Sequence, residues 1–148
     1  MNNHGMTGCL NFYKVKFDNN IFEMQNGKCE DSLNIVNSSG KIKKINITSA
    51  FSDALDIDFS NIFIEDASIN LAGNDCVDFS GGNYEINEFN LKNCGDKGVS
   101  IGEQSNAKIH KIKVENAIIG VASKDSSKSL INTTIMKEVE TCLSSYNK

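Results

Sequence analysis

Asp53-Ala-Leu-Asp-Ile57 is followed 22 residues later by Asp75-Cys-Val-Asp-Phe79, which has the same order of acidic and apolar side chains. The same step recurs along most of the sequence. Two columns of mostly apolar residues keep it: Leu33, Leu55, Val77, Val99, Val121 and Leu143 form the first, and Ile35, Ile57, Phe79 and Ile101 form the second. A short repeat that alternates apolar and polar residues predicts a solenoid, in which equivalent positions of successive coils stack on one another.

The pattern within each repeat predicts strands. Three short apolar groups are separated by turns rich in Asn, Gly and Ser, such as Ser80-Gly-Gly-Asn83. The spacing of three and four that an amphipathic helix requires is not sustained, and the chain contains no proline. We therefore expect an all-β fold, namely a single-stranded right-handed parallel β-helix (solenoid) of about six coils of 22 residues.

Length and composition predict one domain. A chain of 148 residues can bury a narrow continuous core without dividing, so residues 1–148 are expected to form one β-helix domain with an irregular start over residues 1–8. The sequence shows no signal peptide and no apolar run of membrane-spanning length. A solenoid normally ends in an atypical capping segment, and none is evident. We therefore expect a piece of a longer protein, with exposed coil ends that favour end-to-end association.

The charge balance argues against a nucleic-acid partner. The chain has 19 acidic and 15 basic residues, and every basic residue is a lysine. Phosphate recognition favours clustered cations and the bidentate fork of arginine, which this sequence lacks. We expect partners other than nucleic acid.

The five cysteines are expected to be reduced thiols. Cys9, Cys76 and Cys142 share one column, in which successive members lie three coils apart, or about 14 Å at the usual strand spacing. That distance is too long for a disulfide. Cys29 and Cys94 lie near a turn, and they are also three coils from each other. The sequence therefore predicts no disulfide.

Four segments carry a resemblance to a known family. They span residues 53–60, 73–80, 93–103 and 119–127, and the last two contain Gly95-Asp-Lys-Gly98 and Ser123-Lys-Asp-Ser-Ser127. Over residues 8–148 the chain resembles a bacterial family of right-handed parallel β-helix proteins in the pectate-lyase-like group. The resemblance implies a β-helix region of a larger envelope or exported protein, and thus a cell-envelope or extracellular location.

The candidate chemistry lies on the first strand of each coil and in the adjacent turns. Alternation places Leu55 and Ile57 inward, so Asp56, Asp58 and, one coil later, Asp78 should point outward. Stacked carboxylates repel one another unless a cation or backbone amides compensate them. Charged residues in later turns extend this surface. The complete set of candidate ligand-binding residues is Asp56, Asp58, Asp78, Asp96, Lys97, Glu103, Lys124 and Asp125.

One function that fits this surface is enzymatic. Pectate-lyase-like proteins hold calcium with acidic residues against a sugar carboxylate, so Asp56, Asp58 and Asp78 could bind calcium while Lys97 or Lys124 acts as the base. Lyases of this type rely on arginine, which is absent here. The histidines, His4 and His110, do not match the pattern of the related hydrolases either.

The function that we favour is a rigid binding or spacer module without catalysis or cofactor. Its polar outward sheet face would contact carbohydrate or neighbouring domains of the parent protein. Aromatic residues that could stack on sugars are few, because Phe12, Phe59 and Phe79 are expected in the core.

Several of the acidic residues also have a structural interpretation. Asp31, Asp53 and Asp75 recur once per coil at a corner, where a carboxylate can accept hydrogen bonds from turn amides. Asp96 and Lys97 can likewise form a salt-bridged corner, with Glu103 as a further partner of the lysine. For these residues we favour the structural interpretation.

Overall fold

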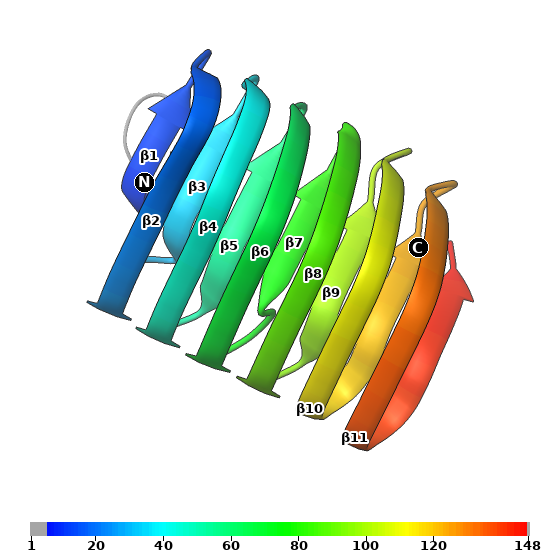
Figure 1. The fold of residues 1–148 in the computed structure, drawn as a ribbon. Helices are drawn as coiled ribbons and strands as arrows, with labels where there is room; N and C mark the ends of the chain where they lie inside the picture. Colours follow the sequence, from blue (N-terminus) through cyan, green and yellow to red (C-terminus); the bar gives the residue numbers. More distant parts are fainter. Residues whose placement is uncertain (1–5, 148) are drawn as a thin grey trace.

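The computed structural model describes residues 6–147, which form a parallel β-solenoid of about six turns (Figure 1). No helix occurs in this part of the chain, so the expected all-β solenoid is confirmed. The strands are β1 (Gly8–Tyr13), β2 (Lys16–Gly27), β3 (Asp31–Val36), β4 (Ser39–Ala50), β5 (Asp53–Asp58), β6 (Asn61–Ala72), β7 (Val77–Ser80), β8 (Asn83–Cys94), β9 (Lys97–Gly102), β10 (Asn106–Lys124) and β11 (Lys128–Tyr146).

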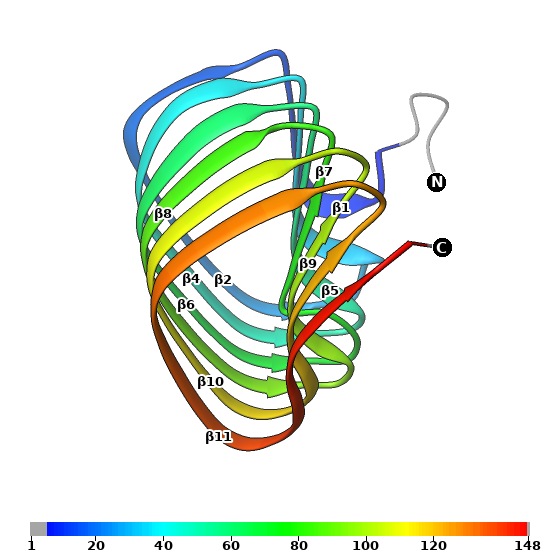
Figure 2. The same ribbon diagram turned by 90° about the vertical axis from the view of Figure 1, so that its right-hand side faces the viewer.

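Odd- and even-numbered strands form two faces that enclose the core (Figure 2). The odd face consists of β1, β3, β5, β7 and β9, and the even face of β2, β4, β6 and β8. The long strands β10 and β11 continue both faces, because the first part of β10 pairs with β8 and its last part pairs with β9. All of these pairings are parallel.

The register confirms the 22-residue columns. Leu55 pairs with Leu33 on one side and with Val77 on the other, and the column continues to Leu143. Leu33, Leu55 and Val77 are fully buried. Leu143 is 58% exposed because it belongs to β11, which has a neighbouring strand on one side only.

Residues in the left-handed backbone region form two recurring corners of the coil. One corner carries Asn37, Phe59, Gly81 and Glu103, and the other carries Ser49, Leu71, Asn93 and Asn116, all with φ between 47° and 70°. The expectation that Phe59 lies in the core is therefore wrong. Its corner position turns the ring outward, and the residue is 55% exposed. Phe79 is fully buried, as expected, and Phe12 packs against the core.

One corner also explains a shift in the repeat. The sequence step is 22 from Ile69 to Leu91 and 23 from Leu91 to Val114, yet Leu91 and Val114 pair in register. Glu103 and Gln104 both adopt positive φ, 54° and 61°, so the turn between β9 and β10 holds the additional residue. The core columns consequently stay aligned.

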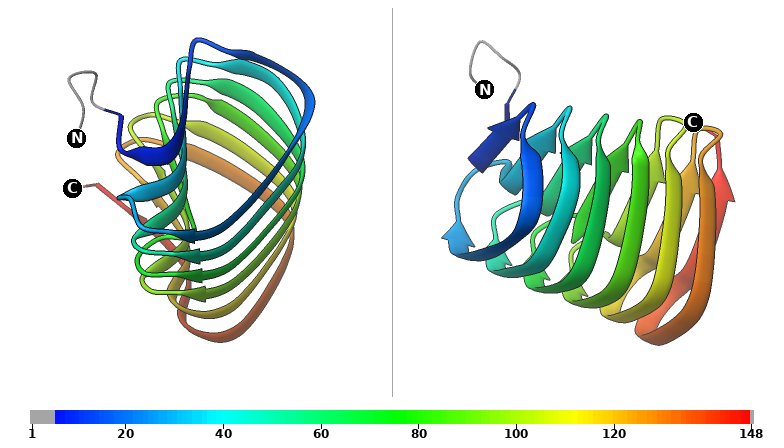
Figure 3. Two further views of the ribbon diagram at one scale, coloured as in Figure 1. Left: turned by 90° about the vertical axis from the view of Figure 1, so that its left-hand side faces the viewer. Right: turned by 45° about the horizontal axis from the view of Figure 1, so that its top comes forward.

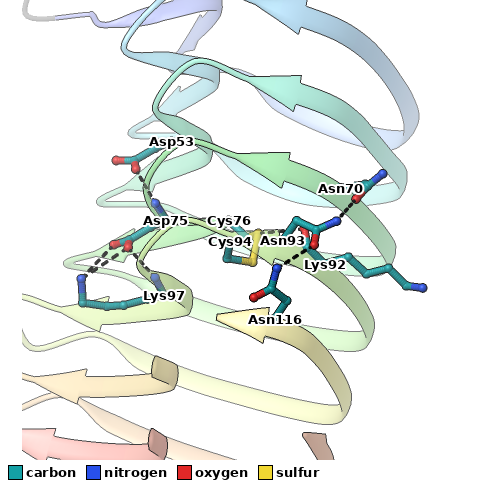
Figure 4. The surroundings of a disulfide bond; sticks show 9 residues. All are labelled: Asp53, Asn70, Asp75, Cys76, Lys92, Asn93, Cys94, Lys97 and Asn116. Carbon is teal, nitrogen blue, oxygen red and sulfur yellow. Dashed lines mark hydrogen bonds and ion pairs between the residues drawn. A yellow bond between two sulfur atoms is a disulfide. The ribbon is translucent and has the colours of Figure 1, made fainter. Parts of the chain in front are cut away.

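Two disulfides contradict the expectation of reduced cysteines. Cys9 is bonded to Cys29, and Cys76 is bonded to Cys94 (Figure 4), with a Cα–Cα distance of 5.3 Å in each pair. The prediction compared cysteines along the columns only. Within one coil, however, residues 18 or 20 positions apart meet again at a corner, because the chain has almost completed its turn. Cys142 is the only free cysteine among the described residues.

Strands β1 and β2 form the first coil at the N-terminal end of the stack (Figure 3), and side-chain packing and pairing differ there from the rest of the solenoid. Phe12, Phe17 and Phe22 form an aromatic cluster with ring centroids 5.3–5.8 Å apart. The pairing of β2 with β4 is interrupted by register shifts between Asp18 and Ile21. These features were not recognised in the sequence because they do not follow the 22-residue repeat.

Candidate functional site

A column of charged residues lies at or just before the start of the odd strands (Figure 4). It consists of Asp31, Asp53, Asp75 and Lys97, and hydrogen bonds within the fold use its carboxylates. The amide of Asp75 donates to Asp53 Oδ1 over 2.8 Å, and the amide of Lys97 donates to Asp75 Oδ1 over 3.0 Å. Asp31 accepts a hydrogen bond from the hydroxyl of Thr7. The amide donors confirm the structural interpretation of Asp53 and Asp75, whereas the donor to Asp31 is a side-chain hydroxyl and not a turn amide.

Lys97 is held by two carboxylates. Its Nζ lies 3.3 Å from Asp75 Oδ1 and also pairs with Asp96. Burial disfavours the charged ammonium, but the bonds to Asp96 and Asp75 outweigh that effect and raise the pKa of Lys97. A lysine that stays protonated is a poor general base. Within residues 6–147, Glu103 is not among the ion-pair partners of Lys97.

Asp56, Asp58 and Asp78 lie on the outer side of the odd face and are half-buried. Asp56 pairs in register with Asp78, and Asn34 Nδ2 donates to Asp56 Oδ2 over 2.8 Å. Burial, followed by the charge of Asp58, raises the pKa of Asp56 to about 9. Burial, followed by the charge of Asp78, raises the pKa of Asp58 to about 6. Asp56 and Asp78 are thus neighbours in register, and Asp58 lies two residues from Asp56 on β5.

A second column pairs in register across the odd strands and consists of Asn34, Asp56, Asp78 and Ser100. It contains buried polar atoms without a hydrogen-bond partner among the described residues. They are Asn34 Oδ1, Asp78 Oδ1 and Ser100 Oγ. Asn34 is 2% exposed and Ser100 is fully buried. Because an unsatisfied buried polar group is costly, this column is a place where the fold accepts an energetic penalty.

A cleft lies elsewhere, along the start of the even strands. Its volume is about 600 Å³, and it runs across β4, β6, β8, β10 and β11. The sequence analysis did not identify it. Residues from five coils line it: Gly40, Asn61, Ile62, Phe63, Asn83, Tyr84, Glu85, Asn106, Ala107, Lys108, Lys128, Ser129 and Leu130. The recurrence of asparagine at 61, 83 and 106 was the signal in the sequence that could have revealed it.

An amide ladder follows the axis of this cleft. Asn83 Nδ2 donates to Asn61 Oδ1 over 2.7 Å, and Asn106 Nδ2 donates to Asn83 Oδ1 over 3.2 Å. The half-buried ring of Phe63 also lines the cleft, with Lys41 Nζ 5.3 Å from its centroid. The cleft thus combines amides with an aromatic side chain.

Charged groups continue this surface. Glu85 Oε1 lies 3.1 Å from Lys108 Nζ and 2.9 Å from His110 Nε2. The hydrogen bond with His110, followed by that with Lys108, lowers the pKa of Glu85, so this carboxylate is ionised at neutral pH. The cleft therefore presents a fixed negative charge beside lysine side chains.

The other candidates occupy less accessible or separate positions. Lys124 is 8% exposed, and its side chain packs closely over Gly102. A Cβ atom added at Gly102 would lie only 3.0 Å from Lys124 Cε. Asp125 follows Lys124 in the turn before β11.

Tyr84, a cleft residue, is largely buried. Its ring stacks on Phe79 with centroids 4.2 Å apart, and its hydroxyl donates to the Ile57 carbonyl over 2.8 Å.

In residues 6–147 no group of three or more His, Cys, Asp or Glu side chains is arranged around a common metal position. The same part of the chain contains no helix that is long and apolar enough to cross a membrane.

Comparison with known proteins identified no family: no protein-family model, curated protein or solved structure matches the chain. The class of the protein therefore follows from its fold. It is a parallel β-solenoid, and the resemblance to the bacterial pectate-lyase-like family has no support beyond the segments that suggested it.

Proposed function

We propose that the protein is a rigid β-helix binding module of an exported or envelope protein, and that it contacts carbohydrate through the cleft on its even face. The observation that carries this proposal is the coincidence of this cleft of about 600 Å³ with the Asn61–Asn83–Asn106 ladder and the ring of Phe63.

The chemistry of the cleft suits a sugar chain. Sugars have hydroxyl groups that both donate and accept hydrogen bonds, and each asparagine side chain offers both functions. The less polar face of a sugar ring can pack on an aromatic side chain such as Phe63. The coils repeat at about 4.8 Å, so a chain that lies along the axis would meet similar groups at regular intervals. A preformed sheet also reduces the entropy that binding must overcome.

The two disulfides support the export part of the proposal. Disulfides form and persist in oxidising environments, and they are rare in reducing ones. Cys9–Cys29 and Cys76–Cys94 therefore favour an extracellular or envelope location, as expected from the resemblance.

The test begins with a glycan array, with and without calcium, followed by calorimetric titration of the glycan that binds best. Phe63→Ala should weaken that glycan about tenfold, which corresponds to about 1.4 kcal/mol. Phe51→Ala is the matched control, because Phe51 is 73% exposed and lies outside the cleft. Equal affinity of wild type and Phe63→Ala would contradict the proposed site.

A second candidate function is a polysaccharide lyase or hydrolase based on the odd face. It is favoured by the raised pKa of Asp56, about 9, next to that of Asp58, about 6, because carboxyl groups with different pKa values can divide acid and base roles. Asp56, Asp58 and Asp78 offer oxygen donors, the type that calcium binds, but calcium would have to displace the proton that Asp56 carries at neutral pH.

This enzymatic candidate has a separate test. Release of unsaturated or reducing sugars from a polysaccharide panel should be lost in Asp56→Asn and retained in Asp66→Asn, an acidic residue of β6 on the even face. Absence of products with the wild-type protein across the panel, with and without calcium, would exclude lyase and hydrolase activity on those substrates.

A further inference from the structure

One carboxylate in the cleft is held at one oxygen and open at the other. Lys108 Nζ donates to Glu85 Oε1 over 3.1 Å, and His110 Nε2 lies 2.9 Å from the same oxygen. His110 is in turn positioned by Asn132, whose Nδ2 lies 3.3 Å from His110 Nδ1. No described residue bonds to the second oxygen of Glu85, Oε2, and this side chain is 45% exposed. Glu85 thus combines a fixed orientation with a free acceptor.

Hydrogen-bond donors accompany this carboxylate in the cleft. Lys108 lies next to Glu85 in register, and its ammonium group has further N–H bonds after the one that it donates to Glu85. Asn83 donates one amide N–H to Asn61 and retains a second one. Lys108 and Asn83 both line the cleft and are exposed. The cleft therefore offers an anionic acceptor, a cationic donor and an amide donor on neighbouring coils.

The aromatic ring of Phe63 lies beside the same carboxylate. Phe63 and Glu85 pair in register on adjacent coils, which are about 4.8 Å apart, and both residues line the cleft. Lys41 pairs with Phe63 from the opposite side, with its Nζ 5.3 Å from the ring centroid. A sugar ring that packs on Phe63 within the cleft therefore brings its hydroxyl groups towards Glu85.

We propose that Glu85 determines the specificity of the cleft and selects sugars that carry two adjacent free hydroxyl groups. This inference rests on the proposed carbohydrate function and names the class of sugar that the cleft takes. A hydroxyl group can donate to the carboxylate while it accepts from Lys108 or Asn83. Two adjacent hydroxyls engage the carboxylate and both donors together, whereas an isolated hydroxyl leaves one of the donors without a sugar partner. Hydrogen bonds to an ionised group are about twice as strong as neutral ones, so the second hydroxyl strengthens binding.

Two sets of linear oligosaccharides test the proposal by calorimetric titration. The internal rings of cellohexaose, maltohexaose, mannohexaose and xylohexaose have adjacent free hydroxyls. The internal rings of laminarihexaose and chitohexaose do not, although laminarihexaose consists of glucose like cellohexaose. The tightest binder of the first set should bind about tenfold more tightly than either member of the second, which is the effect of one hydrogen bond to a charged group.

Glu85→Gln should weaken that binder about tenfold and remove the difference between the two sets, because the amide keeps the size of the side chain but not its charge. Glu88→Gln is the matched control. Glu88 lies on the same strand, accepts a hydrogen bond from Lys111 over 2.8 Å and does not line the cleft. This variant should bind like the wild type. Thermal melts monitored by circular dichroism establish that both variants are folded.

The outcomes separate this inference from the proposed function. Equal binding of the two sets, unchanged affinity in Glu85→Gln, or an equal loss in Glu88→Gln would overturn the role of Glu85, while a sugar would still bind to the protein. Failure of every one of these oligosaccharides to bind would overturn it as well. Only an empty glycan array would extend that result to the proposed function.

Discussion

The disulfide between Cys76 and Cys94 makes a quantitative prediction about stability. It closes a loop between residues 18 positions apart, and the chain-entropy model assigns about 3 kcal/mol of stabilisation to a loop of that size. Replacing both cysteines by alanine should remove that amount. Alanine fits the column, because Ala54 occupies the position of Cys76 one coil earlier. With a typical urea dependence of about 2 kcal/mol per molar, the unfolding midpoint should fall by about 1.5 M.

The assay is equilibrium urea unfolding under non-reducing conditions, accompanied by a count of free thiols in the denatured protein. Cys142→Ser is the control, and it should leave the midpoint unchanged because Cys142 is free and exposed. The wild type should show one reactive thiol. Five reactive thiols in protein prepared under oxidising conditions, or a midpoint that the double variant does not lower, would refute the reasoning.

Three further predictions concern the core and the buried polar groups. Val77→Asp should lower the free energy of unfolding by at least about 4 kcal/mol in urea titrations, since it buries an unpaired charge; a normal midpoint would contradict the register. Tyr84→Phe should cost about 1 kcal/mol in the same assay, because the hydroxyl no longer donates to Ile57; an unchanged midpoint would argue against that bond. Burial raises the pKa of Asp31 to about 6, above its unfolded value near 3.8, so its contribution to stability is present below pH 4 and is lost as pH rises through 6. Urea midpoints of the wild type and Asp31→Asn should accordingly differ more at pH 8 than at pH 4, and a constant difference would contradict this prediction.

The fold was predictable because apolar side chains recur every 22 residues along the sequence. Leu55 and Val77 lie 22 residues apart in the sequence and pair in the structure, so spacing translated directly into contact. The acidic residues Asp56 and Asp78 followed from the same register. Corner residues such as Phe59 were misassigned, because a left-handed backbone position reverses the alternation on which burial was predicted.

The disulfides and the cleft were not predictable by the same argument. The column comparison describes contacts between coils, whereas Cys9 and Cys29 meet through closure of a single coil. The lining of the cleft, from Gly40 to Leu130, includes buried positions such as Tyr84 and exposed positions such as Asn83, so it does not follow from the apolar columns alone. The disulfides therefore could not be obtained from the period between coils, whereas the recurring asparagines at 61, 83 and 106 were a signal of the cleft that was not used.

The three-residue turn from Glu103 to Ser105 shows how this architecture tolerates changes in length. The turn takes up one residue more than its counterpart in the preceding coil, while the strands before and after it keep their partners. Chain length can therefore vary at this corner independently of the interior. Insertions after Gln104, such as an epitope or a fluorophore-acceptor peptide, should be accommodated there, which makes this corner the natural place to label the protein.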